Sequence, residues 1–113
     1  MEAVSVKNVE HYVWGDGCDG WHLLKSSGVS VIQEKVPPGK SEVRHRHVKS
    51  EQFFYILSGE ATIDAGESRT ILRAGEGLHI PPREPHQFKN ESGRDVEFLV
   101  VSAPPSHGDR ENL

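Results

Sequence analysis

The sequence predicts an all-β fold, either a sandwich or a barrel, and three observations lead there. Clusters of Gly, Pro, Asn, Asp and Ser recur along the chain and mark turns. The apolar stretches between them have the length of strands and are too short for stable helices. No apolar stripe at the helical spacing of about 3.6 residues extends over three turns. The clearest expected strands are residues 29–36, 52–57, 61–65, 70–73 and 96–102.

The segment after Glu51 is apolar on both of its faces. Side chains alternate between the two faces of a strand, which places Phe54 and Ile56 on the face of Gln52, and Phe53, Tyr55 and Leu57 on the other. One face is expected to point into the interior. The other is expected to meet another layer, either the N-terminal segment or a second subunit.

The length of 113 residues fits one domain. We expect a barrel core at about residues 28–103, N-terminal strands within residues 1–27, and a C-terminal tail over residues 104–113. The segment 104–113 (PPSHGDRENL) is polar and carries turn residues.

Charge and hydropathy exclude several classes of protein. The net charge is −4 with no block of like charges, which argues against a nucleic-acid surface. No apolar run approaches the roughly 20 residues that a membrane span needs. The first residues lack the basic and apolar regions of a signal peptide, so we expect a cytoplasmic protein. With nucleic acids and membranes set aside, its expected partner is a small molecule.

His45 and His47 stand two positions apart. In a strand this spacing puts both rings on one face about 6 to 7 Å apart. Two imidazoles there can converge on one metal ion at nitrogen–metal distances of about 2.0 to 2.1 Å. An inert, solvated pair of histidines is the alternative, because an H-x-H pattern alone is weak.

Two blocks of the sequence resemble the two motifs of the cupin superfamily. The first runs from Gly39 through His45, His47 and position 52 to Gly59, and the second consists of Gly75, Pro81, His86 and Asn90. The resemblance implies a double-stranded β-helix, or jelly-roll, barrel. It also implies one divalent metal ion (Fe, Mn, Ni, Co or Zn) on His45, His47, His86 and a fourth ligand. The second motif usually has a Gly where this chain has Arg83.

The fourth ligand departs from the family pattern. The superfamily normally has a Glu six residues before the closing Gly, where this chain has Gln52, preceded by Glu51. Neighbouring strand residues point to opposite faces, so Gln52 is expected to point inward. Glu51 replaces it only if a bulge shifts the register. A Gln ligand leaves the full charge of the ion in place, which favours an anionic or enolate-like substrate.

Residues on the face of the ligands are expected to line the pocket. The candidates are Phe54, Ile56 and Phe88; the alternative is that these side chains only fill the barrel. Arg44, Arg46 and Arg83 are candidates to hold a carboxylate at the mouth.

The predicted function is that of a metalloenzyme acting on a small, enolisable or anionic molecule, as a dioxygenase or an isomerase. The catalytic residue is not identified; Glu51, His79 and Tyr55 are the possible bases. The alternative is a non-catalytic cupin module that binds or senses a small molecule. Cupins commonly dimerise through their sheets, and the two-sided strand at 52–57 is compatible with a homodimer.

Overall fold

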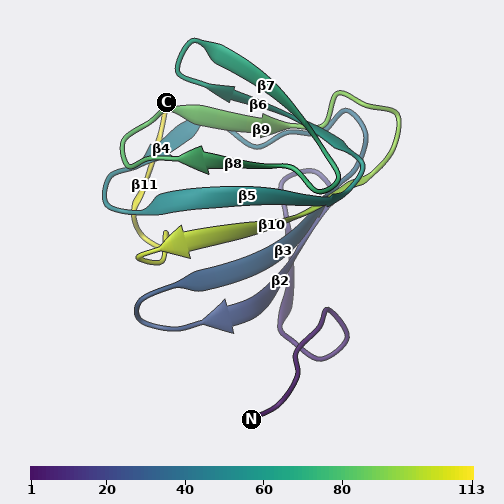
Figure 1. Cartoon of the computed structure of the whole chain (residues 1–113), viewed down its shortest axis with the longest axis vertical. Helices are drawn as coiled ribbons and strands as arrows, with labels where there is room; N and C mark the ends of the chain where they lie inside the picture. The colour runs from purple at the N-terminus through teal and green to yellow at the C-terminus, as the bar shows by residue number, and fades with distance from the viewer.

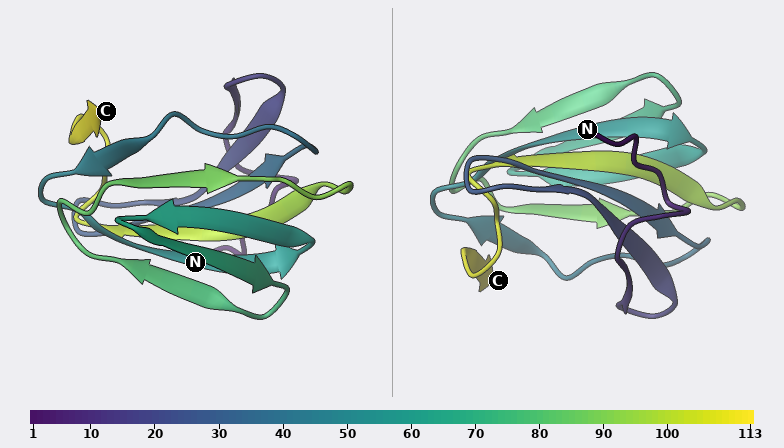
Figure 2. Two further views of the ribbon diagram at one scale, coloured as in Figure 1. Left: turned by 90° about the horizontal axis from the view of Figure 1, so that it is seen from above. Right: turned by 90° about the horizontal axis from the view of Figure 1, so that it is seen from below.

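The computed structural model describes all 113 residues and consists of two β-sheets packed face to face. The six-stranded sheet has the order β1-β2-β3-β10-β5-β8, and the five-stranded sheet has the order β11-β4-β9-β6-β7. Figures 1 and 2 show the two sheets as two layers. This is the predicted all-β jelly-roll barrel, and it contains no helix that could cross a bilayer.

Turns separate the strands along the chain, as the sequence predicts. Those of the six-stranded sheet are β1 (His11–Trp14), β2 (Cys18–Lys25), β3 (Ser30–Val36), β10 (Val96–Ala103), β5 (Glu51–Ser58) and β8 (Gly77–Ile80). Those of the five-stranded sheet are β11 (Arg110–Asn112), β4 (His45–His47), β9 (His86–Lys89), β6 (Glu60–Ala65) and β7 (Ser68–Arg73).

The interior changes character along the paired strands β5 and β10. Their register places Ile56 beside Phe98, Phe54 beside Val100, and Gln52 beside Ser102. Because alternate residues share a face, these pairs form successive rows on the inner side of the sheet. We call the end built by Ile56, Ile63, Phe88 and Phe98 the apolar half; all four are buried. The end that holds Gln52, Ser102 and the buried histidines is the polar half.

A glycine closes the first motif because two conditions require it. Gly59 connects β5 to β6 with a φ of 85°, a left-handed conformation that glycine adopts without strain. A Cβ at this position would also collide with the backbone oxygen of Asp95. The turn fixes where β5 ends, and so fixes which residues of β5 face inward.

The segment 104–113, expected as a tail, folds back onto the barrel. After a turn at residues 106–109 it forms β11, which pairs antiparallel with β4 so that Arg110 lies opposite His47 and Asn112 opposite His45. Polar composition suggested a free segment, but a strand can pair through backbone hydrogen bonds alone. The C-terminal residues therefore cover the edge of the strand that carries the histidines (Figure 1).

Candidate metal centre

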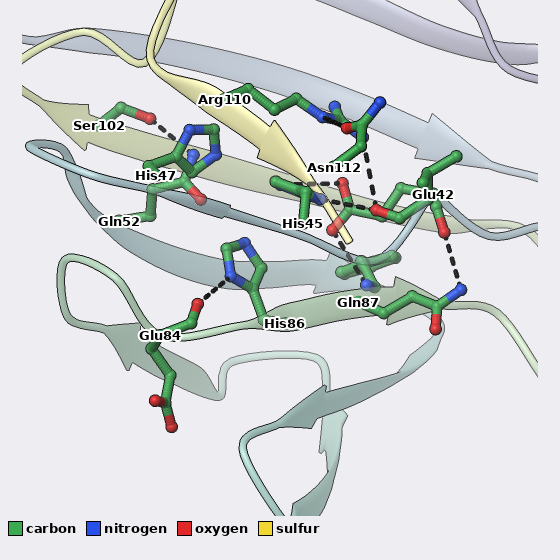
Figure 3. A network of polar contacts seen from close by, with 12 residues as sticks. Glu42, His45, His47, Gln52, Glu84, His86, Gln87, Ser102, Arg110 and Asn112 are labelled. Atoms are coloured by element: carbon green, nitrogen blue, oxygen red, sulfur yellow. Dashed lines mark hydrogen bonds and ion pairs between the residues drawn. The ribbon is translucent and has the colours of Figure 1, made fainter.

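Two neighbouring strands of the five-stranded sheet bring three histidines together. His45 and His47 lie on β4, and His86 begins β9 directly opposite His45. All three are buried. Their candidate ligand nitrogens lie within 4.8 Å of one another, and Figure 3 shows the region in which the three side chains meet. The cluster predicted from the two motifs is thus assembled across strands.

Each imidazole is oriented by a backbone carbonyl. Nδ1 of His45 donates to Val43 O at 2.7 Å, Nδ1 of His86 to Glu84 O at 2.9 Å, and Nδ1 of His47 to Asp109 O at 3.1 Å. A carbonyl only accepts, so Nδ1 carries the hydrogen in all three rings. In a neutral imidazole the lone pair then resides on Nε2. Such outer hydrogen bonds are what a metal-ligating histidine normally makes.

Burial keeps these rings neutral. It lowers the pKa of His45 to about 3, partly offset by the hydrogen bond to Val43. Burial also lowers the pKa of His47 and of His86 below the ordinary value. Because metal binding requires unprotonated imidazole, the rings are in the protonation state that a metal needs at neutral pH.

Gln52 and Glu51 point to opposite sides of β5, as the alternation predicts. Gln52 is buried, and its Nε2 donates to Ser102 Oγ at 3.0 Å. Glu51 is exposed on the outer face, where its carboxylate lies 2.8 Å from His79 Nε2. The register of β5 runs without a bulge through these residues, so Glu51 and His79 both lie outside the pocket.

Two buried acceptor atoms at the cluster lack a hydrogen-bond partner within the chain. They are Nε2 of His86 and Oε1 of Gln52. Buried polar atoms are nearly always satisfied, so an orphaned pair in one place needs an explanation. Imidazole nitrogen suits Zn, Cu, Fe and Ni, and an amide oxygen completes a mixed set. The residues present therefore fit a divalent transition metal.

Asp109 ties the C-terminal segment to the strand that carries His45 and His47 in two ways. Its carbonyl receives the hydrogen bond from His47 described above. Its carboxylate accepts the backbone N–H groups of Val48 at 3.1 Å and of Lys49 and Ser50 at 2.9 Å. The bonds from Ser50 and Lys49 lower the pKa of Asp109, so the carboxylate stays charged and holds the turn between β4 and β5.

A cavity of about 200 Å³ opens beside the cluster, lined in part by His45, His47 and Gln52. Of the three residues expected in its wall, only Phe54 lines it. Ile56 and Phe88 are fully buried in the apolar half, where the Phe88 ring stacks on Phe98 at a centroid distance of 4.0 Å. They fill the barrel one row further in, which is the second possibility that the sequence left open.

Three charged residues in the cavity wall escaped the sequence analysis: Glu34 from β3, Glu42 from the segment before β4, and Arg110 from β11. Arg110 is the cavity's cation, whereas Arg46 pairs with Glu111 at 2.7 Å and neither Arg44 nor Arg83 lines the wall. One signal was available, since Glu34 interrupts an otherwise non-ionic face of the expected strand 29–36.

Glu42 is fixed by the fold. Its Oε1 accepts the N–H of Phe88 at 3.0 Å and its Oε2 lies 3.9 Å from His45 Nε2. Burial raises the pKa of Glu42 to about 7, against the opposing effects of the Phe88 hydrogen bond and of Arg110. Figure 3 shows Glu42 between His45 and the side chain of Gln87, with Arg110 close by.

The solved structures that resemble this chain share its fold. A Thermus thermophilus protein is 27% identical, with a TM-score of 0.80 over 92% of this chain and 98% of that one. The polyketide cyclase RemF of Streptomyces resistomycificus is 22% identical, with a TM-score of 0.85 over 100% of this chain and 85% of that one. At that identity the second likeness concerns the fold alone.

Sequence comparison assigns the family. An uncharacterized protein of Methanocaldococcus jannaschii is 31% identical over 81% of this chain and 74% of its own length. An oxalate-binding protein of Thermotoga maritima is 33% identical over 71% of this chain and 70% of its own length. The family model described as "Cupin domain" matches residues 32–102, which include both histidine motifs. The chain therefore belongs to the cupin family.

Proposed function

We propose that this protein is a metal-dependent enzyme that acts on a small anionic carbonyl compound. His45, His47, His86 and Gln52 would hold one divalent ion. The observation that carries the proposal is the pair of orphaned acceptors, Nε2 of His86 and Oε1 of Gln52, beside two further neutral imidazoles. Ser102 supports the assignment of Gln52, since by accepting from the amide nitrogen it leaves the oxygen for a cation.

The charge of the ligand set favours an anionic substrate. Three neutral imidazoles and a neutral amide cancel none of the ion's positive charge, unlike a carboxylate ligand. A divalent ion held this way supplies Lewis-acid polarisation of a carbonyl oxygen. The guanidinium of Arg110, in the same cavity wall, adds a group suited to a carboxylate.

The size of the cavity limits the substrate. Its volume of about 200 Å³ lies below the roughly 300–1,000 Å³ of pockets for drug-sized ligands. A compact acid fits better than a nucleotide or a large ring system. The oxalate-binding protein among the relatives is named for a ligand of this class, which supports a small carboxylate here.

The identity of the ion separates the two reaction types. Iron would favour a dioxygenase. Zinc, nickel, cobalt or manganese would favour an isomerase, because these ions serve as Lewis acids. We favour the isomerase, since a neutral donor set leaves a strong Lewis acid.

A second candidate is a non-catalytic module that binds a small carboxylate. The name of the Thermotoga maritima relative, which describes binding and no reaction, favours it. The two candidates share the metal centre and differ in turnover. A binding module would hold its ligand unchanged, whereas an enzyme would exchange or convert it.

Metal analysis of untagged protein tests the shared centre. We expect close to one equivalent of a divalent metal in the wild type and almost none in the variant His45→Ala/His47→Ala. The matched control is His11→Ala/His79→Ala, which removes two exposed histidines outside the cluster. Protein that stays metal-free after anaerobic reconstitution, or equal metal in all three forms, would contradict the proposed centre.

We also propose that the protein forms a homodimer through the outer face of the six-stranded sheet. Phe53, Tyr55 and Leu57 stand 43%, 38% and 40% exposed there in the isolated chain, and adjoining apolar residues of this kind mark interaction surfaces. Light scattering should report a dimer for the wild type and a monomer for Phe53→Lys/Tyr55→Lys. Ile71→Lys, an equally exposed position on the other sheet, should remain dimeric.

A further inference from the structure

Glu34 occupies an unusual position on the inner face of β3. In the register of the sheet it lies between Gly20 of β2 and Phe98 of β10. Its neighbours on the same face of β3 are Ile32 and the fully buried Val36. The Glu34 side chain is half-buried, so its charge loses part of its contact with water, which disfavours a carboxyl group here relative to an apolar side chain.

No structural role accounts for the Glu34 carboxyl. The carboxyl takes part in no side-chain hydrogen bond and in no ion pair anywhere in the chain. Glu42, the other carboxyl in the cavity wall, is held by Phe88 N–H and lies against His45. The two acids thus share one cavity, but only Glu42 is engaged by the fold.

We propose that Glu34 is the catalytic residue that transfers the proton of the bound carbonyl compound. This inference rests on the proposed function and adds a base to it. The carboxylate takes a hydrogen from the carbon next to the carbonyl. The C–H bond breaks, its electron pair forms a C=C bond, and the carbonyl π pair moves onto oxygen. The resulting carboxylic acid exchanges its proton with water and returns a hydrogen to the same carbon, which reforms the carbonyl and completes hydrogen exchange without an oxidant. Where that carbon carries a hydroxyl group, the hydroxyl proton moves to the enolate oxygen, and return of the proton to the former carbonyl carbon completes isomerisation.

The cavity is small enough to place Glu34 in contact with its contents. Glu34 lines the same cavity of about 200 Å³ as His45, His47 and Gln52. A molecule that fills this volume touches Glu34 as well as the histidines. A substrate carboxylate on Arg110 and a carbonyl directed at the histidines would leave the adjacent carbon to face β3.

The other ionisable groups that face Glu34 are less suited to act as a base. Burial, and the nearby Glu34, raise the pKa of Tyr12 well above the usual range, so the phenol stays protonated. Burial likewise raises the pKa of Cys18, which lies in the core. Glu42 is already engaged, and the guanidinium of Arg110 has no acceptor for a proton. Only Glu34 combines a free carboxyl with access to the cavity.

The electrostatic surroundings match this role. Burial, together with the nearby Glu42, raises the pKa of Glu34 to about 8, while Arg110 opposes the shift. General bases act best when their pKa lies near the working pH. The carboxylate that forms is a stronger base than an ordinary glutamate, and its population increases as the pH rises toward 8 and beyond.

The test uses the metal-loaded protein with pyruvate as the probe. Pyruvate is a small 2-oxo acid, and loss of its methyl signal in D2O, followed by proton NMR, reports hydrogen exchange next to the carbonyl. We expect exchange by the wild type to increase with pH through about 8. Glu34→Gln should lower the rate by about 10²-fold or more and remove that pH dependence, with unchanged metal content. The control Glu97→Gln, on the outward side of β10, should behave as the wild type.

A second measurement needs neither metal nor turnover. Protein labelled with ¹³C at the glutamate carboxyls, titrated metal-free, should show one carbon with a midpoint near 8 that is missing from Glu34→Gln. An ordinary acidic midpoint for Glu34 would overturn the proposal. Wild-type exchange rates in Glu34→Gln, or no exchange by metal-loaded wild type, would also overturn it and leave the metal centre standing. Absence of bound metal would instead overturn the proposed function, while the titration still reports on Glu34.

Discussion

The apolar half and the polar half of the barrel are built by the same strands, yet they treat their buried atoms differently. In the apolar half, Phe88 stacks on Phe98 with a centroid distance of 4.0 Å, and Ile56 and Ile63 are fully buried beside them. In the polar half, neutral histidines and Gln52 leave acceptor atoms without partners. Phe54, which contacts the rings of both His86 and Phe88, marks the boundary. The apolar half stabilises the fold by packing, whereas the polar half leaves acceptor atoms unpaired that a bound ion or molecule could use.

The largest effect on folding should come from the apolar half. Phe98→Ala removes a buried ring and should lower the free energy of unfolding by about 3–5 kcal/mol, as measured by denaturant titration. Phe53→Ala, in the partly exposed outer row of β5, should cost far less in the monomer. Equal losses in the free energy of unfolding for both variants would contradict the special contribution of the apolar half to stability.

In the polar half, acid should destabilise the metal-free protein. The pKa of His45 is about 3 in the folded state and about 6.5 in an unfolded chain. The unfolded state binds more protons between these values, so stability is complete above about 6.5 and falls as the pH drops toward 3. The loss should be on the order of a few kcal/mol. His45→Ala should flatten the profile, and an unchanged slope would show that His45 is not the source.

Removing the Asp109 carboxylate should weaken metal binding with less effect on folding. Asp109→Ala frees the N–H groups of Val48, Lys49 and Ser50 and loosens the carbonyl that orients His47. Loss of such outer contacts typically costs about 10–100-fold in metal affinity. Competition with a chelator measures this change. Glu111→Ala, on the same segment but paired with Arg46, should bind metal as the wild type does.

The smallest expected effect is a gain in stability. Arg83, the residue after the turn prolines that replaces the usual glycine of the second motif, has a φ of 71°. A left-handed conformation costs a non-glycine residue about 1–2 kcal/mol, and a glycine removes this cost. Part of the gain is offset, because glycine loses more conformational entropy on folding. Arg83→Gly should therefore raise the free energy of unfolding by about 0.5–1 kcal/mol. A decrease would mean that the Arg83 side chain makes a stabilising contact.

The sequence predicted those features that depend on alternation within one strand or on motif spacing. Residues 29–36 and 96–102 correspond closely to β3 and β10, and the inward direction of Gln52 followed from its distance to Gly59. The charged part of the cavity wall was out of reach, because it combines Glu34 and Glu42 with Arg110 from the far end of the chain. Arg110 reaches the cavity through the pairing of β11 with β4, which the polar composition of residues 104–113 did not indicate.

The hydrogen bond between His47 and Asp109 also has a consequence for the order of events in the cell. The two residues are 62 positions apart, and a ribosome adds about 5–20 residues per second. His47 therefore emerges several seconds before the carbonyl that orients its ring. We therefore expect the proposed metal centre to reach its full affinity only after synthesis has passed the C-terminal strand.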